Sequence, residues 1–486
     1  MDVVRTHPRS ADAAGGIRLR APRRAAARVP RAPRRTAVTI ILAVLVQLLL
    51  AAEAQAYAPG QLIFEERIGT SAASAAALAA GPGGATVIAG WKESSSVTAG
   101  IVTIVAKYTV TGRRAWLKTY AGTGSGAEAV ACDRSGNVYV AATFYGAKED
   151  IGLLKYDAAG RFKWKRSYDG PAAGDDWAQA IAVDRSGNVL VAGSSYAANG
   201  RLGIVVVKYR PNGDLAWPAA TRYDSDPGDS DAGSLHCKAL ALDGSGNAYV
   251  TGYSERLVSG AWTQKALTLK FAGTDGVKRW DKTYEARNNT SSWTDNIAVS
   301  GSAVVVTGST GGPAEVDALI VKYGLDGVER YWKEWGAGDG LGEWFGGVVL
   351  DAKGNAYVTG DQWLARGTAT NKAVTMKLNA TLAKVLWKKP YQPAGKYAQG
   401  WYVTRDSLGF VYVLGIRQNT AGNDNFLTMK YSPTGRPRWV KSWSGGGPES
   451  NEPRGLVLGT KGGVYVAGQA TARGAVYQAV LLKYQR

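Results

Sequence analysis

Cysteine, histidine and methionine are scarce in this sequence, which has two, two and three of them among 486 residues. Two cysteines cannot build a disulfide framework, a zinc ribbon or an iron–sulfur site. His7 lies in the amino-terminal leader, so His236 is the one histidine left for chemistry in the rest of the chain. A mechanism that needs two histidines is therefore excluded. Cys132 and Cys237 fall in different repeats and on opposite strand faces, which predicts that they do not pair.

Glycine and aromatic residues, in contrast, are abundant: the chain has 62 glycines, 16 tryptophans and 24 tyrosines. Hydrophobic residues make up 45% of the chain, which is ample for a buried core and argues against disorder. Length alone would suggest about three domains, but that guide fails for repeat folds and large β-proteins.

The amino terminus has the pattern of an export signal. Residues 1–36 contain ten arginines, residues 37–52 form an apolar run, and an Ala-Gln-Ala sequence follows at 54–56. This order predicts a signal peptide at 1–56 that is cleaved after Ala56, because a basic segment, an apolar segment and a small-residue site follow one another. The apolar run is shorter than the roughly 20 residues of a spanning helix, which disfavours an uncleaved anchor. The residues after the Arg34–Arg35 pair favour the general secretory route over twin-arginine export.

The expected location is therefore outside the cytoplasm, as a secreted, periplasmic or cell-surface protein without a membrane span after cleavage. The formal charge of +19 includes ten arginines and three acids of the leader, so the mature chain has 48 basic and 36 acidic residues, a net charge of +12. Such a charge favours the approach of anionic surface polymers without identifying a ligand.

The rest of the chain, 57–486, is an array of one repeat, expected to fold as a single domain. A lysine, followed by an aromatic residue in all but one case, recurs about every 54 residues. Its positions are Lys107, Lys155, Lys208, Lys270, Lys322, Lys377, Lys430 and Lys483. Nine or ten residues later comes an aromatic residue, usually Trp, at 116, 164, 217, 280, 331, 387 and 439.

Each repeat predicts four short strands. The first is apolar and ends at an Asp-x-x-Gly-Asn turn, as at 133–137, 184–188, 243–247 and 351–355. Asp and Asn side chains bond nearby backbone N–H groups in such turns. The second strand reads V-x-V-(A/T)-G, the third ends in Lys-Tyr and the fourth carries the Trp. Four antiparallel strands in each unit of about this length are typical of a β-propeller blade.

Seven repeats are complete, whereas the last stretch, 453–484, supplies only three strands. Residues 60–70 align with 160–170, which places Phe64 at the Trp position. We therefore expect an all-β fold, an eight-bladed β-propeller whose amino-terminal strand completes the carboxy-terminal blade. Closure of this kind removes the free sheet edges.

The repeat resembles the bacterial β-propeller repeat family (SBBP-type repeats), on the basis of D-x-x-G-N-x-Y-V-x-G, K-Y-x-x-x-G-x-x-x-W and Gly/Asp-rich loops between blades. The resemblance covers nearly all of 61–485 and implies the fold, without implying one chemistry. A weaker likeness is to quinoprotein-type eight-bladed propellers, whose blades dock through a small-x-x-x-Trp hairpin such as 383–387. The vicinal disulfide that some of those enzymes carry is absent, and the sequence predicts no cofactor.

The repeated lysines are interpreted as structural, with pairing to the turn aspartates as their expected role. Basic-aromatic strings such as 161–166 also occur in proteins that bind nucleic acid by stacking. Here they fall on the outermost strands, where lysine protects an exposed edge. We therefore expect no nucleic-acid partner.

Aligning the blades on their first turn shows where they differ. Seven residues before the Asp position stand Trp177, His236, Trp293 and Trp344 in blades 3 to 6. This position is small in blades 1 and 2 and polar in blades 7 and 8, although Tyr397 precedes the Gln of blade 7 by two residues. Rings stack on sugars or apolar ligands, and acids orient a ligand through hydrogen bonds. The candidate ligand-binding set is Trp177, His236, Trp293, Trp344, Tyr397 and the adjacent acids Asp176 and Glu343.

The alternative is that these rings fill gaps between neighbouring blades. An Asp-rich loop, with acids at 224, 226, 229 and 231, is interpreted as a solvated turn, and the metal content is left open.

The function expected from the sequence is a secreted, monomeric and non-catalytic recognition module for a surface polysaccharide or a protein partner. The alternative is an extracytoplasmic enzyme, a quinone-dependent dehydrogenase or a polysaccharide lyase or hydrolase, with its site at the channel mouth. An assembly scaffold without a small ligand is a third possibility. No catalytic residue is assigned.

Overall fold

Residues 58–486 form one compact unit in the computed structural model. The structure describes residues 57–486 except for 70, 95–99, 121, 123, 227, 287–289, 313–314, 337–342, 365–370, 395, 448, 461 and 472–475. The predicted signal peptide at 1–56 lies outside the described residues. Within the described residues, no helix has the length and apolar character required to cross a bilayer.

The unit is all-β, and its strands form eight sheets of four antiparallel strands. Blades 1 and 2 are β2 (Ala73–Ala80), β3 (Thr86–Glu93), β4 (Ile101–Tyr108), β5 (Arg114–Tyr120) and β6 (Ser125–Cys132), β7 (Val138–Tyr145), β8 (Glu149–Tyr156), β9 (Phe162–Tyr168). Blades 3 and 4 are β10 (Asp176–Val183), β11 (Val189–Tyr196), β12 (Leu202–Tyr209), β13 (Thr221–Tyr223) and β14 (Ala232–Leu242), β15 (Ala248–Val258), β16 (Ala261–Phe271), β17 (Lys278–Tyr284). Blades 5 and 6 are β18 (Ser291–Val299), β19 (Ala303–Gly312), β20 (Glu315–Gly324), β21 (Glu329–Trp335) and β22 (Glu343–Leu350), β23 (Ala356–Trp363), β24 (Asn371–Leu378), β25 (Val385–Tyr391). Blades 7 and 8 are β26 (Ala398–Arg405), β27 (Val411–Gln418), β28 (Asp424–Tyr431), β29 (Pro437–Trp443) and β30 (Glu452–Leu458), β31 (Gly463–Thr471), β32 (Tyr477–Gln485), β1 (Leu62–Ile68).

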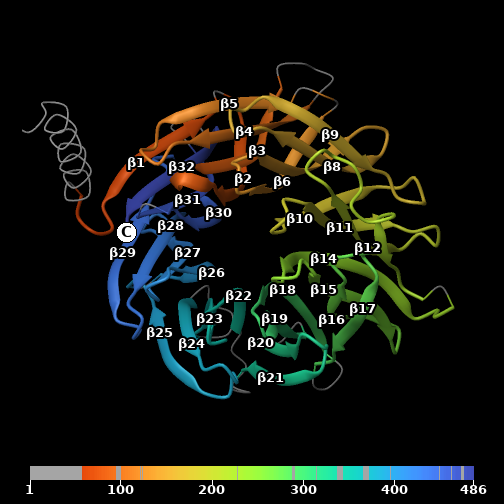
Figure 1. Ribbon diagram of the computed structural model, residues 1–486. Helices are drawn as coiled ribbons and strands as arrows, with labels where there is room; N and C mark the ends of the chain where they lie inside the picture. Colours follow the sequence, from red (N-terminus) through yellow and green to blue (C-terminus); the bar gives the residue numbers. More distant parts are fainter. Residues whose placement is uncertain are drawn as a thin grey trace, which may run out of the picture. The chain divides into compact units, whose positions relative to one another are not determined.

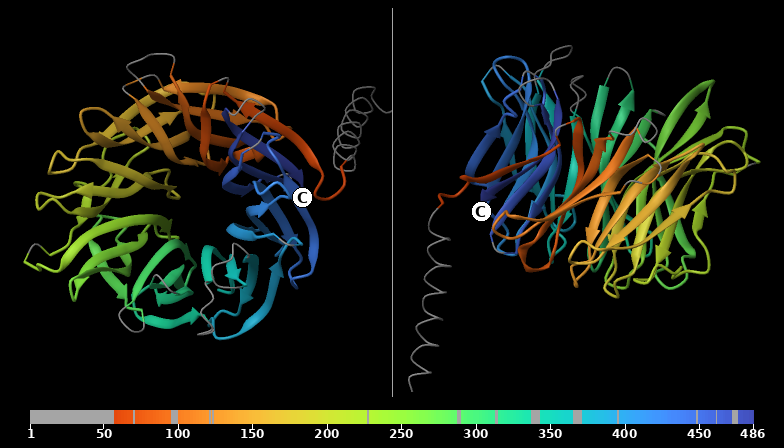
Figure 2. Two further views of the ribbon diagram at one scale, coloured as in Figure 1. Left: turned by 180° about the vertical axis from the view of Figure 1, so that it is seen from behind. Right: turned by 90° about the horizontal axis from the view of Figure 1, so that it is seen from above.

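The blades form a ring in which every innermost strand contacts the innermost strand of the next blade (Figure 1). The contact between β30 and β2 closes the ring. Eight hydrophobic clusters are shared between neighbouring blades, one at each junction. The core of the propeller therefore lies between the blades, and a single 3₁₀ turn, η1 (Pro82–Gly84), interrupts the β structure described. Figure 2 shows the same ring from behind and from above.

The Asp-x-x-Gly-Asn segments form the expected turns between the first and second strands. In blade 2, Asp133 Oδ1 accepts the backbone N–H groups of Ser135 and Asn137, each at 2.9 Å. Its Oδ2 accepts the Asn137 amide at 2.7 Å and the Tyr139 hydroxyl at 3.3 Å. Gly136 has a φ of 80°, a conformation that L side chains rarely adopt. One carboxylate thus satisfies the whole turn, and the same bonds recur in blade 4 around Asp243.

The repeated lysine stands at the same position in each blade because it makes a contact between blades. Lys155 on β8 and Trp164 on β9 both donate to the carbonyl oxygen of Pro211 in the next blade, at 2.6 and 3.1 Å. Lys208 and Trp217 do the same to Gly273 at 2.8 and 3.1 Å. The expected pairing with the turn aspartates holds for Lys208 and Asp184, whose charged atoms are 3.0 Å apart. The other lysines with described bonds reach carbonyl oxygens instead, at Gly136, Ala158, Leu325, Ala380 and Val110. That part of the prediction is wrong for them because the side chain is long enough to reach the next blade.

The amino-terminal strand completes blade 8, as predicted: β1 pairs antiparallel with β32, and Phe64 lies opposite Lys483. The Phe64 side chain has no N–H to donate, and the Tyr465 hydroxyl instead donates to the Val110 carbonyl oxygen at 3.2 Å, beside Lys483 at 2.6 Å. At the junction of blades 7 and 8, Trp439 Nε1 has no hydrogen-bond partner among the described residues. The closing strand is not part of a hairpin there, so no turn carbonyl is held in position for the indole.

Candidate binding site at one face of the ring

The rings aligned from the sequence lie at one level of the propeller, but on strands instead of loops. Trp177, His236, Trp293 and Trp344 are near the starts of β10, β14, β18 and β22, and Tyr397 directly precedes β26. Their side chains are half-buried, neither enclosed between blades nor fully exposed. The first four rings therefore project from the innermost strands, which begin well before the turn.

Two of the rings donate hydrogen bonds to acids of the preceding blade. Trp177 Nε1 donates to the Glu149 carboxylate of the preceding blade. Trp344 Nε1 donates to Asp295 Oδ2, also of the preceding blade, at 3.1 Å. These two tryptophans therefore join neighbouring blades.

His236 stacks on Tyr253 of its own blade, with ring centroids 4.5 Å apart. Its Nε2 lies 3.3 Å from Glu255 Oε1. Burial lowers the pKa of His236, so the imidazole is neutral at pH 7.

The two acids predicted to accompany the rings lie in different surroundings. Asp176 is fully buried, and its Oδ2 accepts the backbone N–H of Gly170 at 2.6 Å. Glu343 is half-buried and accepts a hydrogen bond from Gln362 on the neighbouring strand. Asp176 therefore has no surface to offer a ligand at the mouth of the ring.

A cavity lies beside these rings, where blades 6, 7 and 8 meet. Its volume is about 550 Å³. It is lined by Asn371, Tyr397, Gln399, Trp401, Ile416, Asp424, Ser450, Asn451, Glu452, Gln469 and Tyr477. Of the predicted rings, Tyr397 is the one that lines it. Gln399 and Glu452 occupy the aligned position in blades 7 and 8, so the cavity opens where that position is polar.

A hydrogen-bonded group of polar residues forms one wall of the cavity. The Tyr397 hydroxyl donates to Asp424 Oδ1, and the backbone N–H of Asp424 donates to Ser450 Oγ at 3.0 Å. Asn451 Nδ2 donates to the Asp424 carbonyl oxygen at 2.9 Å. Burial raises the pKa of Asp424, although the bond from Tyr397 acts to lower it. Side chains tied in this way are held in place before a ligand arrives.

A second polar group surrounds an indole. Trp401 Nε1 donates to Gln399 Oε1 at 3.1 Å, and Gln399 Nε2 donates to Asp361 Oδ2 at 3.2 Å. Asn371 Nδ2 donates to the same Asp361 oxygen at 2.5 Å. Burial raises the pKa of Asp361, which is only 4% exposed.

Trp401 reaches the cavity because its strand carries a β-bulge. The pairing of β26 with β27 shifts between Gly400 and Tyr402, which leaves Trp401 unpaired. All eight innermost strands have the same irregularity two residues after the aligned position. The residues at the bulge are Ala76, Glu128, Gln179, Lys238, Asp295, Gly346, Trp401 and Arg454. A bulge changes the direction in which a side chain points. Here the bulges lie on the innermost strands, which line the axis of the ring.

The charge of the cavity is negative although the chain as a whole is basic. Its lining includes Asp424 and Glu452 but no lysine or arginine. Glu452 accepts a bond from Gln469 at 2.9 Å and forms an ion pair with Arg454 at 2.7 Å. A neutral polar ligand suits this lining better than a polyanion does.

Elsewhere, two of the four acids of the Asp-rich loop are neutralised by flanking arginines, because Asp224 and Asp229 pair with Arg222 and Arg256 at 2.7 and 2.6 Å. Both cysteines are free thiols, and burial raises the pKa of each to about 12.

The sequence alignment missed Trp401, Asp424 and Tyr477. Trp401 carried a signal, since it stands at the same offset from the turn as charged residues in other blades. Asp424 and Tyr477 begin β28 and β32, at positions where the repeat shows no regular residue type.

Comparisons with known proteins agree with this fold. A family model described as a beta-propeller repeat matches residues 170–201, which include β10, β11 and the turn between them. No curated protein matches the chain. Among solved structures, the chain is similar to Sqt1 from Chaetomium thermophilum, with 10% identity, a TM-score of 0.54, and coverage of 88% of this chain and 99% of that one.

Two further structures have lower scores. The WD40 domain of SCAP from fission yeast has 8% identity, a TM-score of 0.45 and coverage of 87% and 98%. An ulvan lyase, a polysaccharide lyase, has 12% identity, a TM-score of 0.43 and coverage of 73% and 90%. At these identities the likeness concerns the fold alone. The chain is thus an eight-bladed β-propeller that carries the β-propeller repeat.

Proposed function

We propose that this propeller is an extracytoplasmic recognition module that binds a neutral polysaccharide in the cavity between blades 6, 7 and 8. The observation that carries the proposal is the lining: three rings, Tyr397, Trp401 and Tyr477, together with amide and carboxylate groups. Aromatic faces stack on sugar rings. Amides donate hydrogen bonds to sugar hydroxyl groups and accept them, and carboxylates accept them. The export signal predicted at 1–56 supports a location where such polymers occur.

The test is a binding screen of the purified protein against neutral and anionic polysaccharides, followed by calorimetry on the polymer that binds. Trp401→Ala should weaken binding at least tenfold, which is about 1.4 kcal/mol. Trp262→Ala is the matched control, because Trp262 is 60% exposed and lies at the β15–β16 hairpin outside the cavity. Binding of a neutral polymer should be insensitive to salt. Binding restricted to anionic polymers, or unchanged affinity in the Trp401 variant, would refute the proposal.

A polysaccharide lyase or hydrolase is the second candidate, favoured by Glu128. The side chain of this bulge residue is exposed, but partial desolvation by the surrounding protein raises its pKa to about 7, and Arg454 acts to lower it. A carboxyl group with such a pKa can exchange a proton at neutral pH. Arg454 also pairs with Glu452 of the cavity, so Glu128 is electrostatically linked to the binding region. Release of reducing or unsaturated ends from a bound polymer, lost in Glu128→Gln, would support catalysis.

A further inference from the structure

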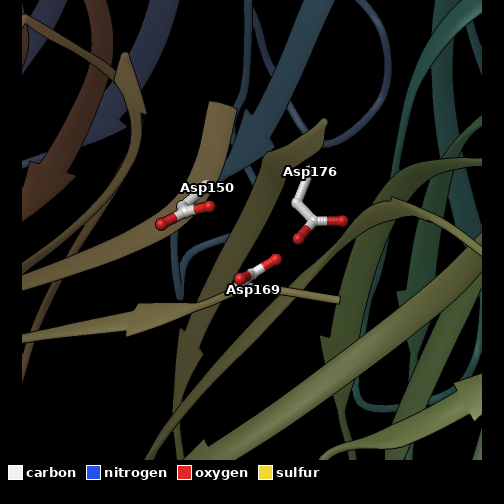
Figure 3. Close-up of side chains that lie close together, drawn as sticks. All are labelled: Asp150, Asp169 and Asp176. Carbon is white, nitrogen blue, oxygen red and sulfur yellow. The ribbon is translucent and has the colours of Figure 1, made fainter. Parts of the chain in front are cut away.

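Three aspartates converge where blades 2 and 3 meet (Figure 3). Asp150 lies on β8, Asp169 directly follows β9, and Asp176 is the first residue of β10. One carboxylate oxygen from each lies within 4.8 Å of the other two. The three residues differ in solvent exposure: Asp176 is buried, Asp150 is half-buried and Asp169 is exposed.

The buried member of the trio is only partly satisfied. Asp176 is 0% exposed, and its Oδ2 accepts the N–H of Gly170 at 2.6 Å, but its Oδ1 has no hydrogen-bond partner among the described residues. In Figure 3 one oxygen of its carboxylate points toward Asp169, and the other points away from the two partner aspartates. A buried carboxylate oxygen without a partner is costly unless a cation or a donor meets it.

Protein cations do little to offset this charge. The neighbouring guanidinium of Arg222 is already bound to Asp224 at 2.7 Å and to the hydroxyl oxygen of Ser195. Asp150 receives one neutral hydrogen bond, from Ser167 Oγ at 2.9 Å. Burial raises the pKa of Asp176, as does the charge of Asp169, whereas the Ser195 hydroxyl, the Gly170 N–H and Arg222 act to lower it. The junction thus concentrates negative charge around an unused oxygen.

We propose that Asp150, Asp169 and Asp176 bind one calcium ion, which joins blades 2 and 3. Carboxylate oxygens without histidine or cysteine select a hard cation. Oxygens on opposite sides of Ca²⁺, at about 2.3–2.6 Å each, are about 4.6–5.2 Å apart, whereas around Mg²⁺ they are about 4.0–4.2 Å apart. Oxygens within 4.8 Å of one another can share either ion, and the flexible coordination of Ca²⁺ suits carboxylates from three separate chain segments better than the strict octahedron of Mg²⁺ does. Water completes the coordination on the exposed side, where Asp169 lies.

The experiment is a calcium titration of chelator-treated protein, followed by calorimetry and by thermal melting. The wild type should bind one Ca²⁺ per chain with a rise in melting temperature, because an ion that binds only the folded state stabilises it. Asp169→Asn should weaken binding at least tenfold, while the metal-free variant melts at or above the wild-type temperature because a like charge has been removed. Asp275→Asn, at a half-buried aspartate of blade 4 outside the trio, is the control and should bind as the wild type does.

Two outcomes would overturn the proposal. One is a wild type that neither binds calcium nor melts higher in its presence. The other is calcium binding that persists unchanged in both Asp169→Asn and Asp150→Asn, which would assign the ion to another acidic region such as the Asp-rich loop at 224–231. Neither outcome bears on polysaccharide binding in the cavity at blades 6 to 8.

Discussion

Phe64 lies against Gly112 so closely that a Cβ on this glycine would be 2.2 Å from two carbons of the phenyl ring. Phe64 belongs to the amino-terminal strand and Gly112 to the hairpin of blade 1, so the contact is made where the ring closes. The same relationship joins Trp116 to Gly160, Trp164 to Gly213 and the corresponding pairs of other junctions. An aromatic side chain of one blade covering a glycine of the next is thus a repeated means of docking.

The first prediction concerns closure. Phe64→Ala should lower the free energy of unfolding by about 2 kcal/mol, less than the 3–5 kcal/mol of a fully buried ring because Phe64 is half-buried. Deleting residues 58–69 should cost more, since blade 8 then loses its outer strand. Thermal and urea unfolding measure both effects. Leu408→Ala, at a residue that is 75% exposed, is the control. A truncated chain that melts within about two degrees of the parent would contradict the role of β1.

The second prediction concerns the lysine that reaches the next blade. Lys155→Met keeps most of the aliphatic stem but removes the donor to Pro211, and should cost about 1.5–3 kcal/mol, the range for a hydrogen bond to a charged group. Lys155 is 8% exposed. The exposed Lys163 on β9 provides the control, because Lys163→Met removes the same charge without touching a blade junction. Equal urea midpoints for the two variants would show that the bond to Pro211 is not stabilising.

The fold could be predicted because the same structural residues recur from repeat to repeat. The lysine of the third strand is present in all eight blades, an aromatic residue follows in the fourth strand, and the full Asp-x-x-Gly-Asn turn occurs in four blades. Each of these residues has one local or nearest-neighbour role. Even the split blade was evident, since Phe64 stands at the Trp position. The contacts of the lysines could not be predicted, because the partner is a backbone oxygen about 55 residues away, as Lys155 and Pro211 illustrate. Every residue has a backbone carbonyl oxygen, so the sequence does not indicate which one accepts the bond.

The candidate site was predicted only in part, for a related reason. A cavity depends on how far neighbouring blades diverge and on which side chains leave space, and neither quantity is periodic. Tyr397 was found because it interrupts the aligned pattern. Trp401 was missed although a β-bulge presents it to the cavity, because a bulge shows no distinctive residue type in these eight strands. The aromatic arc of blades 3 to 6, in turn, has Trp177 and Trp344 engaged with neighbouring blades.

The third prediction is a pH dependence caused by Glu128. Although Glu128 is exposed, partial desolvation by the surrounding protein raises its folded-state pKa to about 7 from an ordinary value of 4.5. Between these pH values the unfolded chain has released the proton while the folded chain retains it, so stability falls as the pH rises through this window. Glu128→Gln should therefore melt higher than the wild type at pH 7.5, and the difference should shrink toward pH 4.5.

Comparing two chains isolates this group, because all other titrating residues are shared. The turn aspartates Asp184, Asp243 and Asp351 have lowered pKa values, since hydrogen bonds outweigh the effect of burial. Their contribution is lost only as the pH falls below the ordinary carboxyl range. Glu329→Gln, at an exposed glutamate of β21, is the control for the loss of one carboxylate. A difference between Glu128→Gln and wild type that stays constant with pH would contradict the assignment.

The last prediction separates the cavity from the aromatic arc. Trp344 is half-buried, donates to Asp295 at 3.1 Å and covers Gly346, where a Cβ would lie 2.2 Å from its ring. We expect Trp344→Ala to lower stability by about 1–3 kcal/mol, through lost packing and an unpaired Asp295, without changing the affinity for a polysaccharide. Trp401→Ala should do the reverse and weaken binding by more than about 1 kcal/mol with a smaller loss of stability. Calorimetry measures the affinity of each variant for the polysaccharide, and unfolding curves measure its stability. Trp293→Ala is tested in the same way as a second member of the arc. If Trp293→Ala and Trp344→Ala both weaken binding while melting as the wild type does, the arc itself is the ligand surface, because a ring that only fills a gap between blades cannot be removed without a loss of stability.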